Sequence, residues 1–291
     1  MRDRQLQLIA RKDFDEAVRS RRLVVMTAVL GLLALAGLYV KASREGVNAK
    51  ALLAFLTYIL AWIVPVVALV SGYMSVVGER RSGSIKLLLG QPFSRAEVLT
   101  GKIIGRSYVI TAAIGIAFAV AGALLLALTS GFPFGTFLWL LFATVLLGVV
   151  YVCISVAVST VASSRLRAMT LTVGLILLFQ IAWSGLTMLL HAVLTLGSFP
   201  PTRAPQWYLF LRHLNPTTAY VRGVSLIFQG AIPYPGVTVD GVPVLRLLAD
   251  PRLRYETPFY LSEGFMLFVL VGWIVAAGGL AYWRLRDADL G

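Results

Sequence analysis

The histidines and methionines of this sequence are side chains that could bind a soft metal ion. The chain has two histidines, His191 and His213, and Met188 lies three residues before His191, so both side chains would share one face of a helix. A thioether and an imidazole suit a soft metal ion. Packing of Met188 against lipid or core, with His191 at the membrane interface, is nevertheless the favoured interpretation.

The motifs of the common membrane enzymes are missing. The sequence contains no HExxH, no paired acids inside an apolar run, and no acid and histidine spaced to share a helix face. Gly101-Lys102 resembles the end of a phosphate-binding loop, but Ile103 follows it and no glycine precedes Gly101 by five places. These absences argue against proton-driven transport and intramembrane proteolysis. They also predict that this chain is no enzyme and binds no ATP or other cofactor itself.

The composition is that of an integral membrane protein. Of the 291 residues, 58% are hydrophobic and only 13% are charged, against about a quarter charged in soluble domains. The net charge of +13 would suggest nucleic acid in a soluble protein, but here the basic residues flank apolar runs, which argues against nucleic-acid binding. Cys153 is the only cysteine, so an intrachain disulfide is excluded.

Six apolar runs meet the length of about 20 residues that a membrane-spanning helix needs. The predicted spans cover residues 23–40, 52–77, 104–128, 135–160, 169–190 and 264–283. The first run follows a polar leader of 22 residues, so we expect a retained span and not a cleaved signal peptide. Pro65 frees a backbone carbonyl inside the second span, which could create a pivot or merely shape the packing.

The distribution of Lys and Arg predicts the orientation. Seven lie in the leader and six between residues 78 and 106, whereas the short loops on the other side hold three and none. Because cytoplasmic loops are enriched in Lys and Arg, we expect both termini and the segment after span two in the cytoplasm. The predicted fold is an all-α polytopic protein of the cytoplasmic membrane, with six transmembrane helices and both ends inside.

The segments outside the spans fall into three regions. Residues 1–22 are predicted to form an amphipathic helix on the cytoplasmic interface, and residues 264–291 form span six and a cytoplasmic tail. The 191–263 loop contains nine of the twelve prolines and many aromatics, which predicts turns and interfacial helices outside the membrane. Asn215-Pro216 predicts a helix start, with Tyr220, Val224 and Phe228 on one face. The loop could be a lid or a passive surface loop.

Residues 78–102, GERRSGSIKLLLGQPFSRAEVLTGK, predict two helices and a tight turn. Ile85, Leu88 and Leu89 give the first helix an apolar face, and Gly90-Gln91-Pro92 must end it. Ser94 and Glu97 have the spacing of a capping box at the start of the second. This shape suits docking of a cytoplasmic partner. The same basic residues would also suit an interfacial helix on anionic membrane lipid, and the residues alone leave the two open.

Three stretches resemble the permeases of ABC-2 type transporters. The sequence GERRSGSIKLLLGQPFSRAEVLTGKIIG resembles the family signature after the second span, IARKDFDEAVRSRR resembles its leading amphipathic helix, and LNPTTAYVRG resembles an Asn-Pro element before the last span. The layout, with its long outer loop, resembles the branch that includes the permease of the nitrous oxide reductase maturation system.

The resemblance implies a coupling helix at about 79–100 that docks on a separate ATP-binding subunit. It implies a docking surface formed by Glu79, Arg80, Arg81, Gly83, Ser84, Lys86 and Leu88, followed by the turn and cap at Pro92, Ser94 and Glu97. It also implies two copies of the ATPase, which would bind ATP and Mg, and a second permease chain in a homodimer.

The expected function is that of the transmembrane subunit of an ATP-driven exporter. The apolar, charge-poor spans favour a lipophilic or amphiphilic substrate. One alternative is ATP-driven movement of an extracytoplasmic partner protein, as in metalloenzyme maturation, with the outer loop as its docking site. The other is a membrane scaffold that transports nothing and whose basic segments only bind anionic lipid.

Overall fold

The computed structural model describes residues 48–78, 94–129, 131–196, 205–228, 238–239, 242–243 and 258–286, and isolated positions between 25 and 39. Those isolated positions, within the first predicted span, are helical. The amphipathic helix predicted at 1–22, the segment 79–93 and most of the loop 229–257 lie outside the described residues.

Five helical segments of the described chain are long and apolar enough to cross a membrane. They are α3 (Ala49–Gly72), α6 (Arg95–Leu128), α7 (Phe134–Val161), the composite of α8 (Arg165–Leu177), η1 (Leu178–Ala182) and α9 (Trp183–Leu194), and α13 (Glu263–Arg286). They correspond to the second to sixth predicted spans. The clearest difference in bounds is at the second span, because α3 ends at Gly72 and residues 73–76 form a turn.

The segment between α9 and α13 contains shorter elements. These are α10 (Gln206–His213), α11 (Pro216–Ser225), the 3-10 turns η2 (Leu226–Phe228) and η4 (Phe259–Leu261), and the two-residue strands β1 (Thr238–Val239) and β2 (Val242–Pro243). The strands pair antiparallel, with Thr238 opposite Pro243 and Val239 opposite Val242. This ladder is the departure from the predicted all-α fold within the described ranges.

Helix α7 lies at the centre of the bundle and packs against α3, α6, α11 and α13. From Val150 to Thr160 every one of its residues is buried. A helix that is apolar around its whole circumference is expected to be enclosed by other helices, and the sequence of α7 has this character. Helix α7 is therefore the central helix around which α3, α6, α11 and α13 pack.

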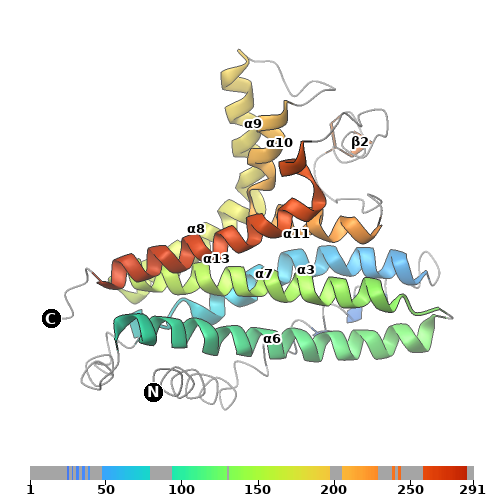
Figure 1. The fold of residues 1–291 in the computed structure, drawn as a ribbon, viewed down its shortest axis with the longest axis horizontal. Helices are drawn as coiled ribbons and strands as arrows, with labels where there is room; N and C mark the ends of the chain where they lie inside the picture. Colours follow the sequence, from blue (N-terminus) through green and yellow to red (C-terminus); the bar gives the residue numbers. More distant parts are fainter. Residues whose placement is uncertain are drawn as a thin grey trace.

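Helices α3, α6, α7 and α13 run side by side along the bundle, whereas α9 and α10 turn away from it (Figure 1). The end of α3, the start of α6, the end of α7 and the end of α13 lie at the same end of the bundle (Figure 1). We call this the basic end, because it carries the basic residues Lys102, Arg106, Arg165, Arg167, Arg284 and Arg286. We call the opposite end the outer end.

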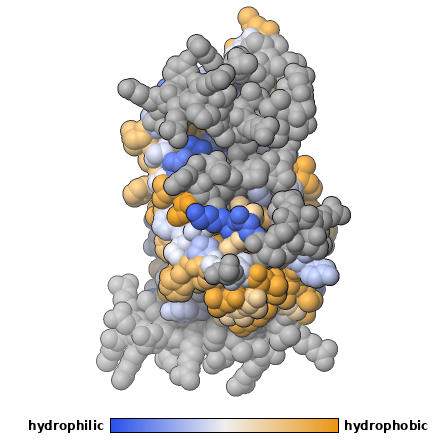
Figure 2. Space-filling view, turned by 90° about the vertical axis from the view of Figure 1, so that its right-hand side faces the viewer, coloured by the Kyte–Doolittle hydropathy of each residue, from blue (hydrophilic) through white to orange (hydrophobic). Residues whose placement is uncertain are grey.

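The surface of the bundle is strongly apolar, as expected for contact with lipid. Large hydrophobic side chains are exposed on all the long helices, among them Trp62, Tyr108, Phe142, Ile181 and Phe268. Figure 2 views the molecule from the outer end, where hydrophilic residues gather between hydrophobic patches. The described helices thus combine an apolar circumference with polar groups at the ends, which is the arrangement that a bilayer requires.

Candidate functional site

The helix that follows the segment 79–93 begins at a capping box. Ser94 is the N-cap of α6, and its hydroxyl accepts a hydrogen bond from the backbone N–H of Glu97 at 3.2 Å. In return, the N–H of Ser94 donates to Oε2 of Glu97 at 2.8 Å. The start of α6 is therefore fixed at the residue that the sequence predicts. Residues 79–93, which include the whole predicted docking surface and the predicted turn at Pro92, lie outside the described residues.

Two serines of α7 form hydrogen bonds with the residues that precede the segment 79–93. The Ser155 hydroxyl donates to the carbonyl of Leu69 at 2.7 Å. The Ser159 hydroxyl accepts from the N–H groups of Val76 and Val77, at 2.9 and 3.1 Å. All these contacts are buried and join α7 to the last turn of α3 and the turn after it. We call Ser155 and Ser159 the serine clamp.

Gly72 makes this close approach possible. A Cβ atom at residue 72 would lie 2.6 Å from Oγ and 2.9 Å from Cβ of Ser155, and real Cβ atoms essentially never come so close to another heavy atom. Arg106 of α6 reaches the same turn, because its guanidinium donates to the carbonyl of Ser71 at 3.4 Å. The C-terminal end of α3 is thus bonded to both α6 and α7, a few residues before the segment 79–93.

A second set of polar contacts lies inside the bundle, around the proline of α3. Pro65 has no N–H, so the carbonyl of Ala61, four residues earlier, lacks its partner within the helix. The side-chain amide of Gln180 fills this gap by donating to the Ala61 carbonyl at 3.1 Å. The same amide lies 3.4 Å from Oγ1 of Thr217 on α11. The carbonyl that the proline frees is therefore bonded by a side chain from another span.

Gln180 belongs to the π-helical turn η1, at which the fifth described span changes from α8 to α9. The Nδ2 group of Asn215 donates to the carbonyl of Phe179 in this turn at 2.6 Å. The Oδ1 atom of Asn215 accepts from the N–H of Thr217 at 2.8 Å and so caps α11. The sequence predicts this N-cap, and the structure confirms it.

Helix α11 is buried in the bundle. Its Thr217 hydroxyl pairs with the hydroxyl of Tyr151 on α7 at 2.7 Å, and Tyr220 pairs with Thr144 at 3.0 Å. Tyr220 is fully buried, and α11 packs against α3, α7 and α13. The polar residues of α11 can be buried because α7 and η1 provide hydrogen-bond partners for them. The interfacial position that the sequence predicts for helices of this loop stays a prediction.

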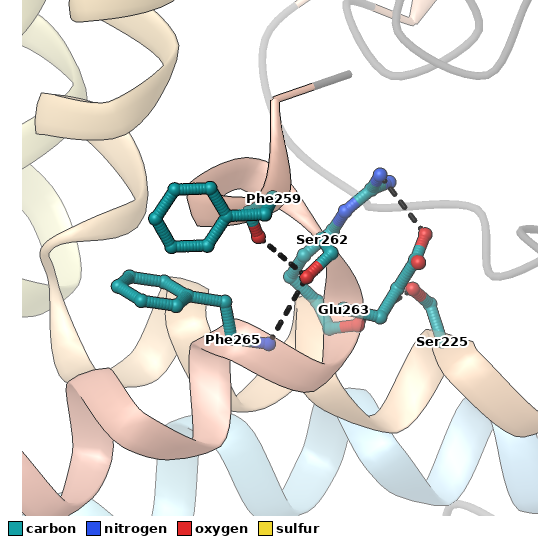
Figure 3. A network of polar contacts seen from close by, with 6 residues as sticks. Ser225, Phe259, Ser262, Glu263 and Phe265 are labelled. Atoms are coloured by element: carbon teal, nitrogen blue, oxygen red, sulfur yellow. Dashed lines mark hydrogen bonds and ion pairs between the residues drawn. The ribbon is translucent and has the colours of Figure 1, made fainter. Parts of the chain in front are cut away.

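An ion pair joins α11 to α13 at the outer end. Arg222 and Glu263 lie 2.9 Å apart, and 28% of each side chain is exposed. Next to it, the Ser262 hydroxyl donates to the carbonyl of Phe259 at 2.6 Å and accepts from the N–H of Phe265 at 3.3 Å, as Figure 3 shows. Residues 229–257 of the outer loop connect η2 to η4 in the sequence, so these contacts lie on both sides of this part of the loop.

The two histidines lie in aromatic and cationic surroundings. His191 is buried and stacks on Trp207, with the ring centroids 5.7 Å apart, and Tyr208 meets it edge-on at 5.1 Å. Burial lowers the pKa of His213 to about 4, an effect that its hydrogen bond to the Leu209 carbonyl opposes and nearby Arg222 reinforces. Within the described ranges, no group of three His, Cys, Asp or Glu is placed to hold a metal. The contacts of His191 agree with packing.

The family model for "ABC-2 family transporter protein" matches residues 7–290, which is nearly the whole chain. The chain belongs to the ABC-2 transporter family. Two relatives carry the name "Probable ABC transporter permease protein NosY". That of Stutzerimonas stutzeri is 29% identical over 242 residues, covering 80% of this chain and 86% of the relative. That of Pseudomonas aeruginosa is 30% identical over 220 residues, covering 73% and 78%.

This protein is thus a multi-pass permease subunit of the cytoplasmic membrane, and its family in general works with an ABC ATPase. Within the permease, the structure brings the two ends of the segment 79–93 together at the basic end. It also reveals contacts that the sequence does not predict, above all the bond between Gln180 and Ala61. The signals for it were a proline inside one span and a glutamine inside another, but nothing in the sequence pairs the two residues.

Proposed function

We propose that this permease is driven by a separate cytoplasmic ATPase that docks on residues 79–88. The observation that carries this proposal is the anchoring of that segment at both ends. The serine clamp holds its beginning, and the capping box of α6 fixes the helix that follows it. A load applied between these anchors would pass directly into α3, α6 and α7. Lipid binding alone has no need of such anchoring.

In this proposal, the docking surface is formed by Glu79, Arg80, Arg81, Gly83, Ser84, Lys86 and Leu88. Two copies of the ATPase bind ATP and Mg, and two copies of this chain form the membrane part. The substrate is lipophilic or amphiphilic and is exported, in accord with spans that carry few charges. In this division of labour, the permease chains form the path of the substrate and change conformation, and the partner hydrolyses ATP.

Charge reversal at Arg80 and Arg81 tests the docking surface. The permease is solubilised gently from membranes of cells that also make its ATPase, and the copurifying proteins are identified by mass spectrometry. We expect a stoichiometric partner with a phosphate-binding loop for the wild type. For Arg80→Glu/Arg81→Glu we expect a loss of copurification and ATPase activity, while a scaffold would instead lose salt-dependent lipid binding. Reversal at Arg284 and Arg286, also at the basic end, is the matched control and should retain the partner.

Transport is tested separately with the purified complex in liposomes. ATP-dependent movement of an apolar fluorescent compound across the bilayer is the expected result. Absence of movement for every apolar compound tried, in a complex that hydrolyses ATP, would refute the lipophilic substrate. Mass measurement of the intact complex tests whether it contains two permease chains and two ATPases.

A second candidate function is favoured by α11. The chain that leads into and out of the outer loop is fixed in the bundle core and is joined to α13 by the Arg222–Glu263 pair. Movement of the bundle would therefore reach the outer loop, as ATP-driven movement of an extracytoplasmic protein requires. Deletion of residues 231–255 should then abolish binding of that protein and leave ATPase activity unchanged. A deletion that leaves the binding unchanged would refute this second function.

A further inference from the structure

Two helix irregularities of this permease face one another inside the bundle. One is Pro65, which removes the N–H that would bond the Ala61 carbonyl. The other is η1, a π-helical turn of the kind that is often found at functional positions. The Gln180 amide, which lies in the π-turn, donates to the Ala61 carbonyl at 3.1 Å. A carbonyl accepts only, so the nitrogen of the amide must face it.

The same amide group also links α3 to α11 and, through α11, to α7. It lies 3.4 Å from Thr217 Oγ1, which pairs in turn with the Tyr151 hydroxyl at 2.7 Å. One side chain thus connects four elements through Ala61, Gln180, Thr217 and Tyr151, which we call the Gln180 network. Polar side chains within a membrane are costly and rare, which marks this network as a functional candidate.

The elements that the network connects lead away from it to opposite ends of the bundle. Helix α3 runs from the network to the serine clamp and ends at Gly72, shortly before the segment on which the ATPase is proposed to dock. Helix α11 begins at the network and leads to the outer loop, and Asn215 fixes its start to the π-turn. A helix interrupted by proline can bend at the interruption, and a π-turn can shift its register. The network therefore joins the two places at which these spans can most easily deform.

We propose that Gln180 is a positioning residue that couples movement of α3 to α11. This inference rests on the proposed ATPase-driven function. When docking shifts α3, the Ala61 carbonyl moves, and Gln180 carries that displacement to Thr217. Without the amide, α3 and α11 keep their direct packing contact but lose the hydrogen-bonded link between the Ala61 carbonyl and Thr217, so α11 follows a bend at Pro65 less closely.

Two variants separate this role from stability. Gln180→Met keeps the approximate size of the side chain but removes its donors, so the Ala61 carbonyl loses its bond and the protein is destabilised. Pro65→Ala supplies a backbone N–H that can bond Ala61 within α3. In the double variant Gln180→Met/Pro65→Ala, the Ala61 carbonyl is therefore bonded within α3, but the hydrogen-bonded link to α11 is missing. Thr57→Val is the matched control, because among the described residues the Thr57 hydroxyl donates to the carbonyl of Leu53 within its own helix.

The test measures amide hydrogen exchange of the full complex in lipid nanodiscs, nucleotide-free and trapped with ATP and vanadate. In the wild type and in Thr57→Val, we expect trapping to change exchange both at residues 73–78 and at residues 216–225. In the double variant, the change at 73–78 is retained and the change at 216–225 is clearly smaller than in the wild type, because only the packing contact between α3 and α11 remains. A double variant that responds like the wild type at both segments would overturn the inference, as would a wild type that responds at 73–78 only. No response at 73–78 in the wild-type complex would overturn the proposed docking itself.

Discussion

The contact between Gly72 and the serine clamp predicts a large effect of a single methyl group. In Gly72→Ala, the new Cβ would meet Ser155 Oγ at 2.6 Å and Ser155 Cβ at 2.9 Å. Rotation of the hydroxyl could relieve the first contact, but it would break the buried bond to Leu69, worth about 1 kcal/mol. Rotation cannot move the Cβ of Ser155, so the helices must separate, at a cost of about 1–3 kcal/mol.

The expected destabilisation of Gly72→Ala is thus about 2–4 kcal/mol. At roughly 2–4 °C per kcal/mol, the apparent Tm should fall by about 5–15 °C. Tryptophan fluorescence of the purified chain in detergent, heated at a fixed rate, measures this fall. Gly115→Ala in α6 is the matched control, because a Cβ there meets nothing within 4 Å. The double variant Gly72→Ala/Ser155→Gly should melt above Gly72→Ala. If Gly72→Ala melted like Gly115→Ala, the close approach of α3 and α7 would be refuted.

Three further predictions concern α10, α11 and the outer end. Asn215→Ala removes a helix cap and the donor to Phe179, so it should destabilise by about 2–4 kcal/mol, and Asn215→Ser, whose neutral hydroxyl can still cap α11, should recover part of the lost Tm. Arg222→Met should cost only about 0–1 kcal/mol because the pair is partly exposed; the swap Arg222→Glu/Glu263→Arg should restore stability at low salt, and a cost that salt leaves unchanged would contradict an ionic role. The pKa of His213 is about 4 in the folded protein, compared with an ordinary value of 6.5. As the pH falls, this histidine is therefore protonated in the unfolded chain before it is protonated in the folded chain. Its contribution to stability is complete above pH 6.5 and is lost between pH 6.5 and about 4; unfolding followed against pH should show this loss, and His213→Gln should abolish it.

The spans and helix starts could be predicted because their signals are local. An apolar run of the right length indicates a span wherever it lies, and the five described segments match the predicted ranges. Asn215 before Pro216, and Ser94 three residues before Glu97, provide caps through contacts within one turn. The role predicted for residues 79–88 depends on a second protein and stays a prediction.

The position of α11 could not be predicted, because it depends on partners far away in the sequence. Tyr220 and Val224 suggest a helix with one apolar face, which is what an interfacial helix also shows. Its polar Thr217 is acceptable in the core because Tyr151, 66 residues earlier, and Gln180, on another span, provide hydrogen-bond partners. Likewise, the sequence shows that Pro65 frees a carbonyl but not that Gln180, 119 residues beyond Ala61, bonds to it.

The burial of α11 also has a consequence for biosynthesis. The polar groups of α7 at Thr144 and Tyr151 are paired by residues that a ribosome adds only some 70 residues later. Until α11 has been synthesised and has packed against α7, the nascent chain holds a central helix whose hydroxyls lack their partners from α11. The bundle must therefore close late, after most of the spans have been made. Quality control that removes incomplete chains would have this interval in which to act.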